Sequence, residues 1–272
     1  MEQFNAVQHQ NTASGNRDSQ IKMLSNSTRG EDNHASPNNG VVMAHLDDLH
    51  EPSNLWDGFA VEPAHGTWHW MKDLLLSIIC SNDPQLFKYL VGWMAAMVQK
   101  PDSAGQVALF LNGAGDTGKG MFIRFISDLM GEHVFHVTDL KQVTGRFNSH
   151  LKDCVLLVME GAFSAGNNRV ESVLKTLISE SSIAIKQKGK DMQIVPNKFH
   201  VILSGNDNRV LDIAVRRRLC VLNVSNARQH DNEYFSKIAK EMADGGLSAM
   251  LYDLQHFDLG GFDVRDVPRT QG

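Results

Sequence analysis

Apolar residues recur at helical intervals between residues 68 and 99. They form one face of Leu74, Leu75, Ile78 and Ile79, and a second face of Leu86, Tyr89, Leu90, Trp93 and Met97. Asp83 followed by Pro84 is typical of a helix start, because Asp caps free N–H groups and Pro tolerates the first helical position. The pattern predicts two helices that meet there, and we interpret the stripe of Trp93 and Met97 as core packing.

After Pro101 the pattern changes to short apolar runs separated by amphipathic segments. The runs predicted as strands are 107–111, 154–159, 199–204 and 219–224, and the predicted helices are 121–130, ended by Gly131, and 171–180. Residues 183–186 and 192–195 flank a polar stretch at 187–191, which predicts a hairpin with a basic tip. Continuous apolar strands alternating with helices predict an α/β fold with a mostly parallel sheet covered on both faces.

The first 50 residues differ from the rest of the chain. They are rich in Asn, Ser, His, Gln and Asp, and their apolar residues are sparse and without period. Such a stretch cannot bury enough surface to offset the entropy lost on ordering, so we expect disorder or the remnant of an upstream domain. The predicted organisation is therefore a segment 1–50, a small helical region 51–102 and a parallel-sheet core 103–272.

Composition and charge narrow the function classes. The formal net charge of −5 argues against coating nucleic acid by bulk charge, so any nucleic-acid site must be local. Cys80, Cys154 and Cys220 lie apart in apolar runs, which favours buried reduced thiols over a zinc site. The apolar runs are too short to cross a bilayer and no secretion signal is evident, so we expect a cytoplasmic protein without a membrane partner.

Residues 113–119 fit the pattern GxxxxGK, directly after a predicted strand and before a predicted helix. Glycines allow consecutive N–H groups to face one phosphate, and the lysine reaches the outer phosphates. The alternative is a glycine-rich turn with a solvated lysine. The cradle would comprise Gly113, Ala114, Gly115, Asp116, Thr117, Gly118, Lys119, Gly120 and Met121. Gly120 stands where a Ser or Thr hydroxyl would bind Mg²⁺.

The cradle is one of several motifs that follow one another along the chain. They are residues 54–60, 79–83, Trp93 with 99–101, 113–120, Pro196-Asn197, Ser204-Gly205-Asn206, Arg217-Arg218 and 263–268. In this order they resemble the superfamily 3 helicase domains of phage and plasmid primase–helicases, including the marine-phage type of primase–polymerase. The resemblance covers about residues 54 to 270, and a glycine after the cradle lysine is common in that family.

The resemblance implies an AAA+-like P-loop ATPase that acts in replication of a virus, plasmid or other mobile element, in the cytoplasm of a bacterial host. It implies a homo-hexameric ring that uses ATP and Mg²⁺ between subunits and moves along single-stranded DNA, with a primase or polymerase as a further partner. Lys119 would contact phosphate and Asn206 would position the attacking water. Arg217 or Arg218 would reach the nucleotide of the neighbouring subunit. The alternatives are a strand-ending turn at Asn206 and a solvated basic cluster at the arginines.

Lys186, Lys188 and Lys190 fall on the predicted hairpin, which projects into the ring channel in the family. Alternate lysines around a glycine would form a local phosphate-binding patch, consistent with a protein that is acidic overall. The alternative is a plain charged hairpin.

The residues at the end of the second predicted strand, where the family has an acidic motif, depart from the family pattern. Where the family has Asp and then Glu at the end of the second strand, this chain has Glu160 and Gly161. Glu160 would hold Mg²⁺ or serve as the base, and Gly161 leaves the other role unfilled. Two functions follow: an ATP-driven helicase, or a nucleotide-binding replication or assembly subunit deficient in hydrolysis. A small-molecule kinase shares the P-loop but leaves Asn206 and the arginines without a role.

Overall fold

The computed structural model describes residues 56–161, 168–206 and 217–268, which belong to one compact unit. The predicted disordered segment 1–50 lies outside the described residues. No helix in the described ranges is long and apolar enough to span a membrane.

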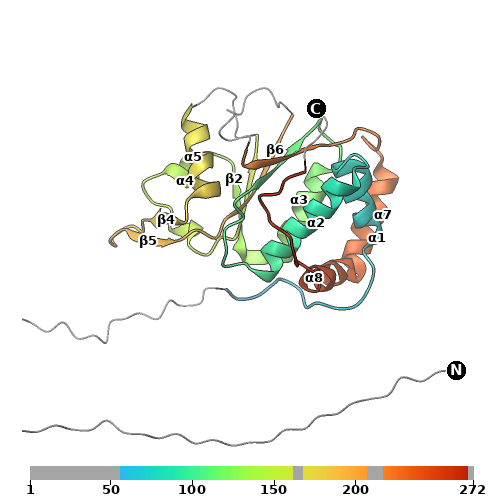
Figure 1. Cartoon of the computed structure of the whole chain (residues 1–272), viewed down its shortest axis with the longest axis horizontal. Coiled ribbons are helices and arrows are strands. Elements are labelled where there is room, and N and C mark those ends of the chain that lie inside the picture. Colours follow the sequence, from blue (N-terminus) through green and yellow to red (C-terminus); the bar gives the residue numbers. More distant parts are fainter. Residues whose placement is uncertain (1–55, 162–167, 207–216, 269–272) are drawn as a thin grey trace, which may run out of the picture. The chain divides into compact units, whose positions relative to one another are not determined.

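Five parallel strands form the central sheet, in the order β2-β3-β6-β1-β7 (Figure 1). Their bounds are β1 Ala108–Asn112, β2 Val134–Val137, β3 Leu156–Glu160, β6 His200–Gly205 and β7 Leu219–Asn223. All four pairings are parallel, as the continuous apolar runs predicted. The sequence pattern missed β2, an edge strand in which His136 is exposed and only Val137 is buried.

Side chains along each strand alternate between two cores on opposite faces of the sheet. On β1, Leu109 and Leu111 belong to one core, and Ala108 and Phe110 belong to the other. Both cores are closed to solvent because helices cover the two faces, which confirms the predicted α/β architecture.

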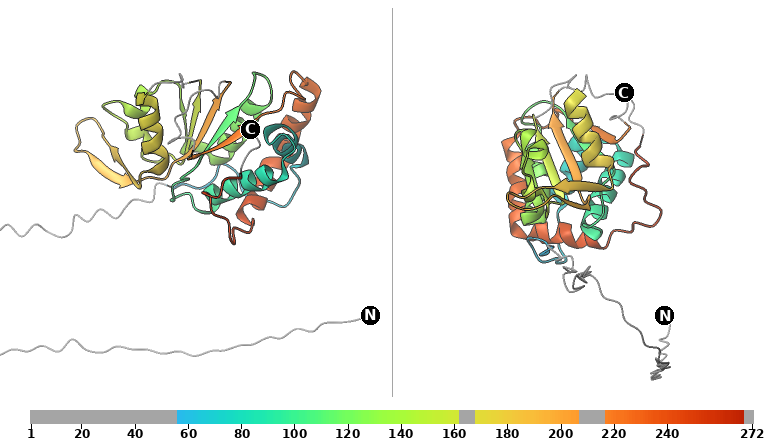
Figure 2. Two further views of the ribbon diagram at one scale, coloured as in Figure 1. Left: turned by 45° about the horizontal axis from the view of Figure 1, so that its top comes forward. Right: turned by 90° about the vertical axis from the view of Figure 1, so that its left-hand side faces the viewer.

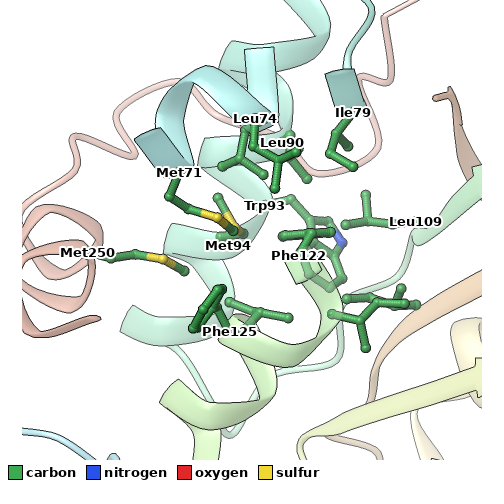
Figure 3. Close-up of a cluster of buried hydrophobic side chains, with 14 of the residues drawn as sticks. Met71, Leu74, Ile79, Leu90, Trp93, Met94, Leu109, Phe122, Phe125 and Met250 are labelled. Atoms are coloured by element: carbon green, nitrogen blue, oxygen red, sulfur yellow. The ribbon is translucent and has the colours of Figure 1, made fainter. Parts of the chain in front are cut away.

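The larger core is built mainly by helices. It contains residues of α1 His69–Asp73, the π-helical turn η2 Leu74–Ile79, α2 Pro84–Gln99, α3 Lys119–Met130, α7 Asn232–Glu241, η5 Met242–Gly246 and α8 Leu247–Gln255. Figure 3 shows Met71, Met94 and Phe122 converging in this core. Trp93 and Met97 are fully buried, so the interpretation of their stripe as core packing is confirmed. The Asp83 carboxylate accepts hydrogen bonds from the N–H groups of Gln85 and Leu86, as expected of a cap.

The helices α7 and α8, which were not predicted from the sequence, are hydrogen-bonded to α1 and the residue before it, the first helix described. Tyr234 donates its hydroxyl hydrogen bond to Asp73 at 2.7 Å, and the Trp68 indole donates to Asp253 at 2.8 Å. These two bonds fasten the last helices to the first one, on the same side of the sheet as α3 (Figures 1 and 2).

The smaller core lies on the opposite face, under α4 Lys141–Thr144 and α5 Asn168–Ser179 (Figure 1). The short turns η3 Gly131–His133 and η4 Ser149–Leu151 complete the helical elements described. The predicted hairpin is confirmed as β4 Ser182–Ile185 paired antiparallel with β5 Gln193–Pro196.

The three cysteines are free and buried, as predicted. Burial raises the pKa of each thiol, and that of Cys220 reaches about 12. The thiols therefore stay protonated and chemically quiet at neutral pH.

Candidate functional site

The carboxyl ends of three neighbouring strands meet at one edge of the sheet. Asn112 on β1 is in register with Gly205 on β6, and Glu160 on β3 is in register with Ser204 on β6. The Gly113 N–H donates to the Gly205 carbonyl at 3.0 Å, so the pairing continues into the cradle. Segments far apart in the sequence are thereby brought together where open α/β sheets bind their ligands.

Two glycines allow the cradle to turn as it does. A Cβ at Gly113 would lie 3.0 Å from the Val224 Cβ and 3.2 Å from the Val224 carbonyl oxygen, so any other residue would require Val224 to shift by a few tenths of an ångström. Gly118 has φ +98°, a left-handed conformation that side chains disfavour. Helix α3 begins at the next residue, Lys119, so its N-terminal dipole points into the cradle.

The Lys119 ammonium folds back over the cradle. It donates to the carbonyl of Gly113 at 2.6 Å and also to that of Ala114. Burial lowers the pKa of Lys119, and the nearby carboxylates of Asp116 and Glu160 oppose that shift. The ammonium thus lies over the cradle with two backbone carbonyls as its acceptors.

A cavity of about 730 Å³ opens over this edge. Its lining contains Gly113, Gly115, Asp116, Thr117, Gly118, Lys119, Gly120, Met121, Glu160, Gly161, Ser204, Gly205, Asn206, His230, Asn232 and Phe235. Of the residues predicted for the cradle, only Ala114 is not part of the lining, and its carbonyl receives the Lys119 ammonium. The predicted Lys119, Glu160 and Asn206 therefore share one cavity.

The side chains in this cavity fit a Mg²⁺ ion that is shared with a nucleotide. Mg²⁺ in such sites takes one or two carboxylates, phosphate oxygens and water. Glu160 is exposed at the end of β3 and could supply a carboxylate, and the Ser204 hydroxyl lies in the same lining. Gly120 and Gly161 carry no side-chain oxygen, so the protein contribution to such a shell would be small.

Three lining residues come from a region in which the sequence analysis found no motif. His230, Asn232 and Phe235 lie in and before α7. The loop before α7 also contacts the cradle directly, because the Gln229 amide donates to the Gly115 carbonyl at 2.9 Å. No local pattern marks these residues, since only the packing of α7 against α1 brings them here.

Arg217 and Arg218 lie at the opposite edge of the sheet. They precede β7, and the Arg218 carbonyl accepts a hydrogen bond from the N–H of Ala108, the first residue of β1. A strand of five residues spans roughly 16 Å. The sheet therefore separates both arginines from the cradle of their own chain.

The two arginines line a second cavity, of about 930 Å³. Lys175 and Arg265 also line it, so basic side chains from α5 and from the C-terminal segment join the arginine pair. Asp102 and Glu180 line it too, and the Arg265 guanidinium is paired with the Asp263 carboxylate at 2.7 Å, so the charges in this cavity are mixed.

The predicted basic hairpin is attached to a loop that the sequence analysis did not single out. Asn148 makes three hydrogen bonds to β4 and its following residue: its backbone N–H donates to the Lys186 carbonyl, its amide donates to the Ala184 carbonyl, and its side-chain oxygen accepts from the Lys186 N–H. Lys186, Lys188 and Lys190 are all exposed at the hairpin tip. Phe147, 42% exposed, lies beside Asn148 in the sequence, and its ring centroid is 5.4 Å from the Arg146 guanidinium.

Asn197 belongs to the Pro196-Asn197 motif and holds the base of the hairpin in place. Its buried amide donates to the carbonyls of Leu177 and Glu180 at the end of α5, and its side-chain oxygen accepts from the Phe199 N–H. Asn197 also lines the cavity of Arg217 and Arg218. The hydrogen bonds of Asn197 thus connect the end of α5 and the end of the hairpin with the start of β6.

Comparison with known proteins agrees with this architecture. Residues 111–218 match the model of a family of unknown function, DUF5906. Over 188 residues the chain is 24% identical to the DNA primase-polymerase of Nitratiruptor phage NrS-1, covering 67% of this chain and 26% of that protein. The chain therefore spans about a quarter of this curated relative.

Two apo structures of the C-terminal region of NrS-1 superpose on the chain with TM-scores of 0.66 and 0.65, at 20% and 21% identity. They cover 82% and 81% of this chain, and the chain covers 53% of each of them. The chain thus shares the α/β fold of the C-terminal region of that phage primase-polymerase.

Proposed function

We propose that this chain is an ATP-dependent DNA helicase module in the replication of a virus, plasmid or other mobile element, acting in the cytoplasm of the host cell. The observation that carries the proposal is the single cavity in which Lys119, Glu160 and Asn206 meet at the carboxyl ends of β1, β3 and β6. The relationship to a phage DNA primase-polymerase supports the replication role.

In the proposed reaction, ATP lies with its phosphates in the cradle. The N–H groups at the start of α3 and the Lys119 ammonium bind the β- and γ-phosphate oxygens. Glu160 would hold Mg²⁺, which would neutralise charge on the phosphates. Asn206 would orient the water that attacks the γ-phosphorus; the bond from that phosphorus to the β–γ bridging oxygen breaks, ADP and phosphate leave, and the proton of the water passes to solvent.

The position of the arginine pair supports a ring, which we propose to be a homo-hexamer. Because the sheet separates Arg217 and Arg218 from their own cradle, they could reach a nucleotide only on a neighbouring chain. A head-to-tail contact that repeats between identical chains forms a ring when the rotation between neighbours closes, and a filament when it does not. An arginine supplied from the neighbour would stabilise the charge that develops during phosphoryl transfer.

Single-stranded DNA would bind at the hairpin. The exposed lysines 186, 188 and 190 would contact phosphates, and the adjoining Arg146 and Phe147 would offer a cation and an aromatic face to the bases. A primase or polymerase, on the same or another polypeptide, would be the partner in replication.

The test is the ATPase rate with and without single-stranded DNA, together with the native mass. We expect DNA-stimulated hydrolysis by an assembly of six chains, lost in Lys119→Ala. Lys152→Ala is the matched control, because Lys152 is an exposed lysine close to the amino end of β3 and away from the cavity. A wild-type protein that neither binds nor hydrolyses ATP would overturn the proposal.

A second candidate function is a nucleotide-binding replication or assembly subunit with little hydrolysis. The specific observation in its favour is Gly161, which leaves the cavity without a second carboxylate beside Glu160. A strand-displacement assay with and without ATP distinguishes the two, since the second candidate would assemble on DNA with ATP but would not separate the strands.

A further inference from the structure

The cavity over the cradle has two chemically different parts. One part consists of the phosphate cradle with Glu160, Ser204 and Asn206, and all of its side-chain groups suit charged oxygens or metal. The other part contains Met121, His230, Asn232 and Phe235, which provide a thioether, an imidazole, an amide and a phenyl ring. A phenyl ring and a thioether do not stabilise a charged phosphate. A heterocyclic base packs favourably against both and is oriented by a few directed polar groups.

Phe235 is held against the cradle itself. A Cβ placed on Gly118 would lie 3.0 Å from the Phe235 Cε1, so the ring packs on the residue before Lys119. Phe235 is only partly buried, and its neighbour Tyr234 is anchored by the 2.7 Å hydrogen bond to Asp73. The ring therefore occupies a fixed position with part of its surface in the cavity.

Asn232 is the first residue of α7, and its side chain is exposed toward solvent and cavity. Within the described part of the chain its side-chain amide has no hydrogen-bond partner, whereas the preceding Asp231 accepts from the Tyr234 N–H as the cap of α7. The cap thus fixes the helix start, while the amide of Asn232 stays available to a ligand.

The same wall is bonded to the phosphate cradle. The Gln229 amide donates to the Gly115 carbonyl, and the His230 imidazole lies 3.7 Å from the Asp116 carboxylate. A ligand that contacts both parts of the cavity would therefore be bound by elements that are already connected, which limits the ordering required on binding.

From this geometry we propose that Phe235 and Asn232 form the nucleobase subsite of the cavity and set its preference for adenine. The inference rests on the proposed nucleotide site and adds the residues that select the base. The base lies against the exposed part of the Phe235 ring, on the side of Met121. The Asn232 amide donates to a ring nitrogen of adenine and accepts from its 6-amino group.

The amide reads the edge that adenine presents with nitrogen 7 and the 6-amino group. Guanine presents two acceptors there, nitrogen 7 and the oxygen at position 6, so one of the two amide contacts is lost whichever way the amide is turned. A carboxylate at residue 232 loses the donor to nitrogen 7 of adenine, and it can accept from the N–H at position 1 and the 2-amino group of guanine when the base turns in the cavity. A bidentate amide–adenine pair discriminates by a factor of about 10 or more.

Calorimetric titration of the full chain with ATP, GTP and inorganic tripolyphosphate tests the subsite. We expect wild type to prefer ATP over GTP about 10-fold. Asn232→Asp should abolish or reverse that ratio, whereas Asn226→Asp, which adds the same charge at an exposed position outside the cavity, should preserve it. Phe235→Leu should weaken ATP and leave tripolyphosphate affinity unchanged, since the cradle is intact.

The outcomes separate this inference from the proposed function. If wild type binds tripolyphosphate as tightly as ATP, or if Asn232→Asp leaves the ATP-to-GTP ratio unchanged in folded protein, the base subsite is wrong and the phosphate site stands. If Phe235→Leu weakens ATP and tripolyphosphate equally, Phe235 supports only the cradle and the subsite is again overturned. If wild type binds neither ligand, both proposals fail.

Discussion

The backbone N–H of Gly113 donates to the carbonyl of Gly205 at 3.0 Å, and this bond joins the cradle to the last residue of β6, directly before Asn206. Strand β6 is in turn paired with β3, which ends at Glu160. A substitution in the cradle should therefore also shift Asn206 and Glu160, the residues proposed to position water and metal.

Gly113→Ala should weaken ATP binding and destabilise the fold, because its Cβ would lie 3.0 Å from Val224 Cβ. Overpacking of this kind costs about 1–3 kcal/mol. The matched control is Gly115→Ala, whose Cβ would meet nothing within 4 Å. Urea unfolding and ATP titration of both variants are the measurements. Equal stability and affinity in the two variants would contradict the close approach at Gly113.

Gly161→Glu should raise the rate of ATP hydrolysis, because it restores a carboxylate beside Glu160. Space is available, since a Cβ at Gly161 meets nothing within 4 Å, but the φ of +61° costs a side chain about 1 kcal/mol. A positioned base contributes about 10²-fold or more, so we expect a clear increase in kcat. Gly161→Gln controls for shape without charge, and equal rates in the two variants would show that the carboxylate has no part in the reaction.

Mixing Lys119→Ala protein with Arg217→Ala/Arg218→Ala protein should restore ATPase activity that neither has alone. In a randomly mixed ring, about a quarter of the interfaces combine an intact cradle with intact arginines of the neighbour. We therefore expect recovery of up to about a quarter of the wild-type rate. No recovery under conditions where native mass shows mixed assemblies would place the arginines outside the site.

Replacing Lys186, Lys188 and Lys190 by Ala should weaken single-stranded DNA binding and flatten its salt dependence. Each phosphate contact on a single strand contributes about 0.7 to the slope of log affinity against log salt, so the slope should fall by about 2. The control Lys88→Ala/Lys152→Ala/Lys240→Ala removes the same charge from exposed lysines elsewhere. Fluorescence anisotropy at several salt concentrations measures both, and equal slopes would exclude the hairpin as the phosphate contact.

His200 should make the fold sensitive to mild acid. Burial lowers its pKa to about 4 from an ordinary value of 6.5, and its ring packs edge-on against Trp93. The unfolded chain therefore binds the proton more readily, so stability falls as pH drops from about 6.5 to about 4. His200→Gln should be less stable at pH 7 but lose less stability over that interval. Urea unfolding at pH 7 and pH 5 measures the difference, and identical losses in both proteins would contradict a buried neutral imidazole.

Much of the fold follows from local pattern. Helix α2 was predicted with its cap at Asp83, and β1, β3, β6 and β7 were each predicted within two residues at either end. These elements are strongly apolar or sharply capped, so neighbouring residues determine them. Strand β2 and the C-terminal helices were not predicted, because β2 lies at a sheet edge with little burial and α7 is stabilised by its contact with α1.

Some residues of the candidate site could likewise be named from the sequence, and others only from the structure. Lys119 could be named from the GxxxxGK pattern between a strand and a helix, whereas Glu160 and Asn206 were named through the resemblance to a family. All three line one cavity because parallel strands end at a common edge. Asn232 and Phe235 could not be named from sequence, since nothing in α7 marks them until the helix packs beside the cradle. The attachment of the loop at 146–148 to the hairpin likewise depends on the Asn148 hydrogen bonds, which connect segments distant in sequence.

The sequence by itself determined the parallel α/β core and the glycine-rich turn at residues 113–119 between β1 and α3, because strand burial, capping and glycine spacing act between near neighbours. Only the tertiary structure decided what surrounds the cradle: which strand lies beside β1, which helix provides the second wall of the cavity, and that the arginines face away from it. These features depend on packing between segments distant along the chain, and the free energy of that packing belongs to the assembled core and to no single stretch of residues.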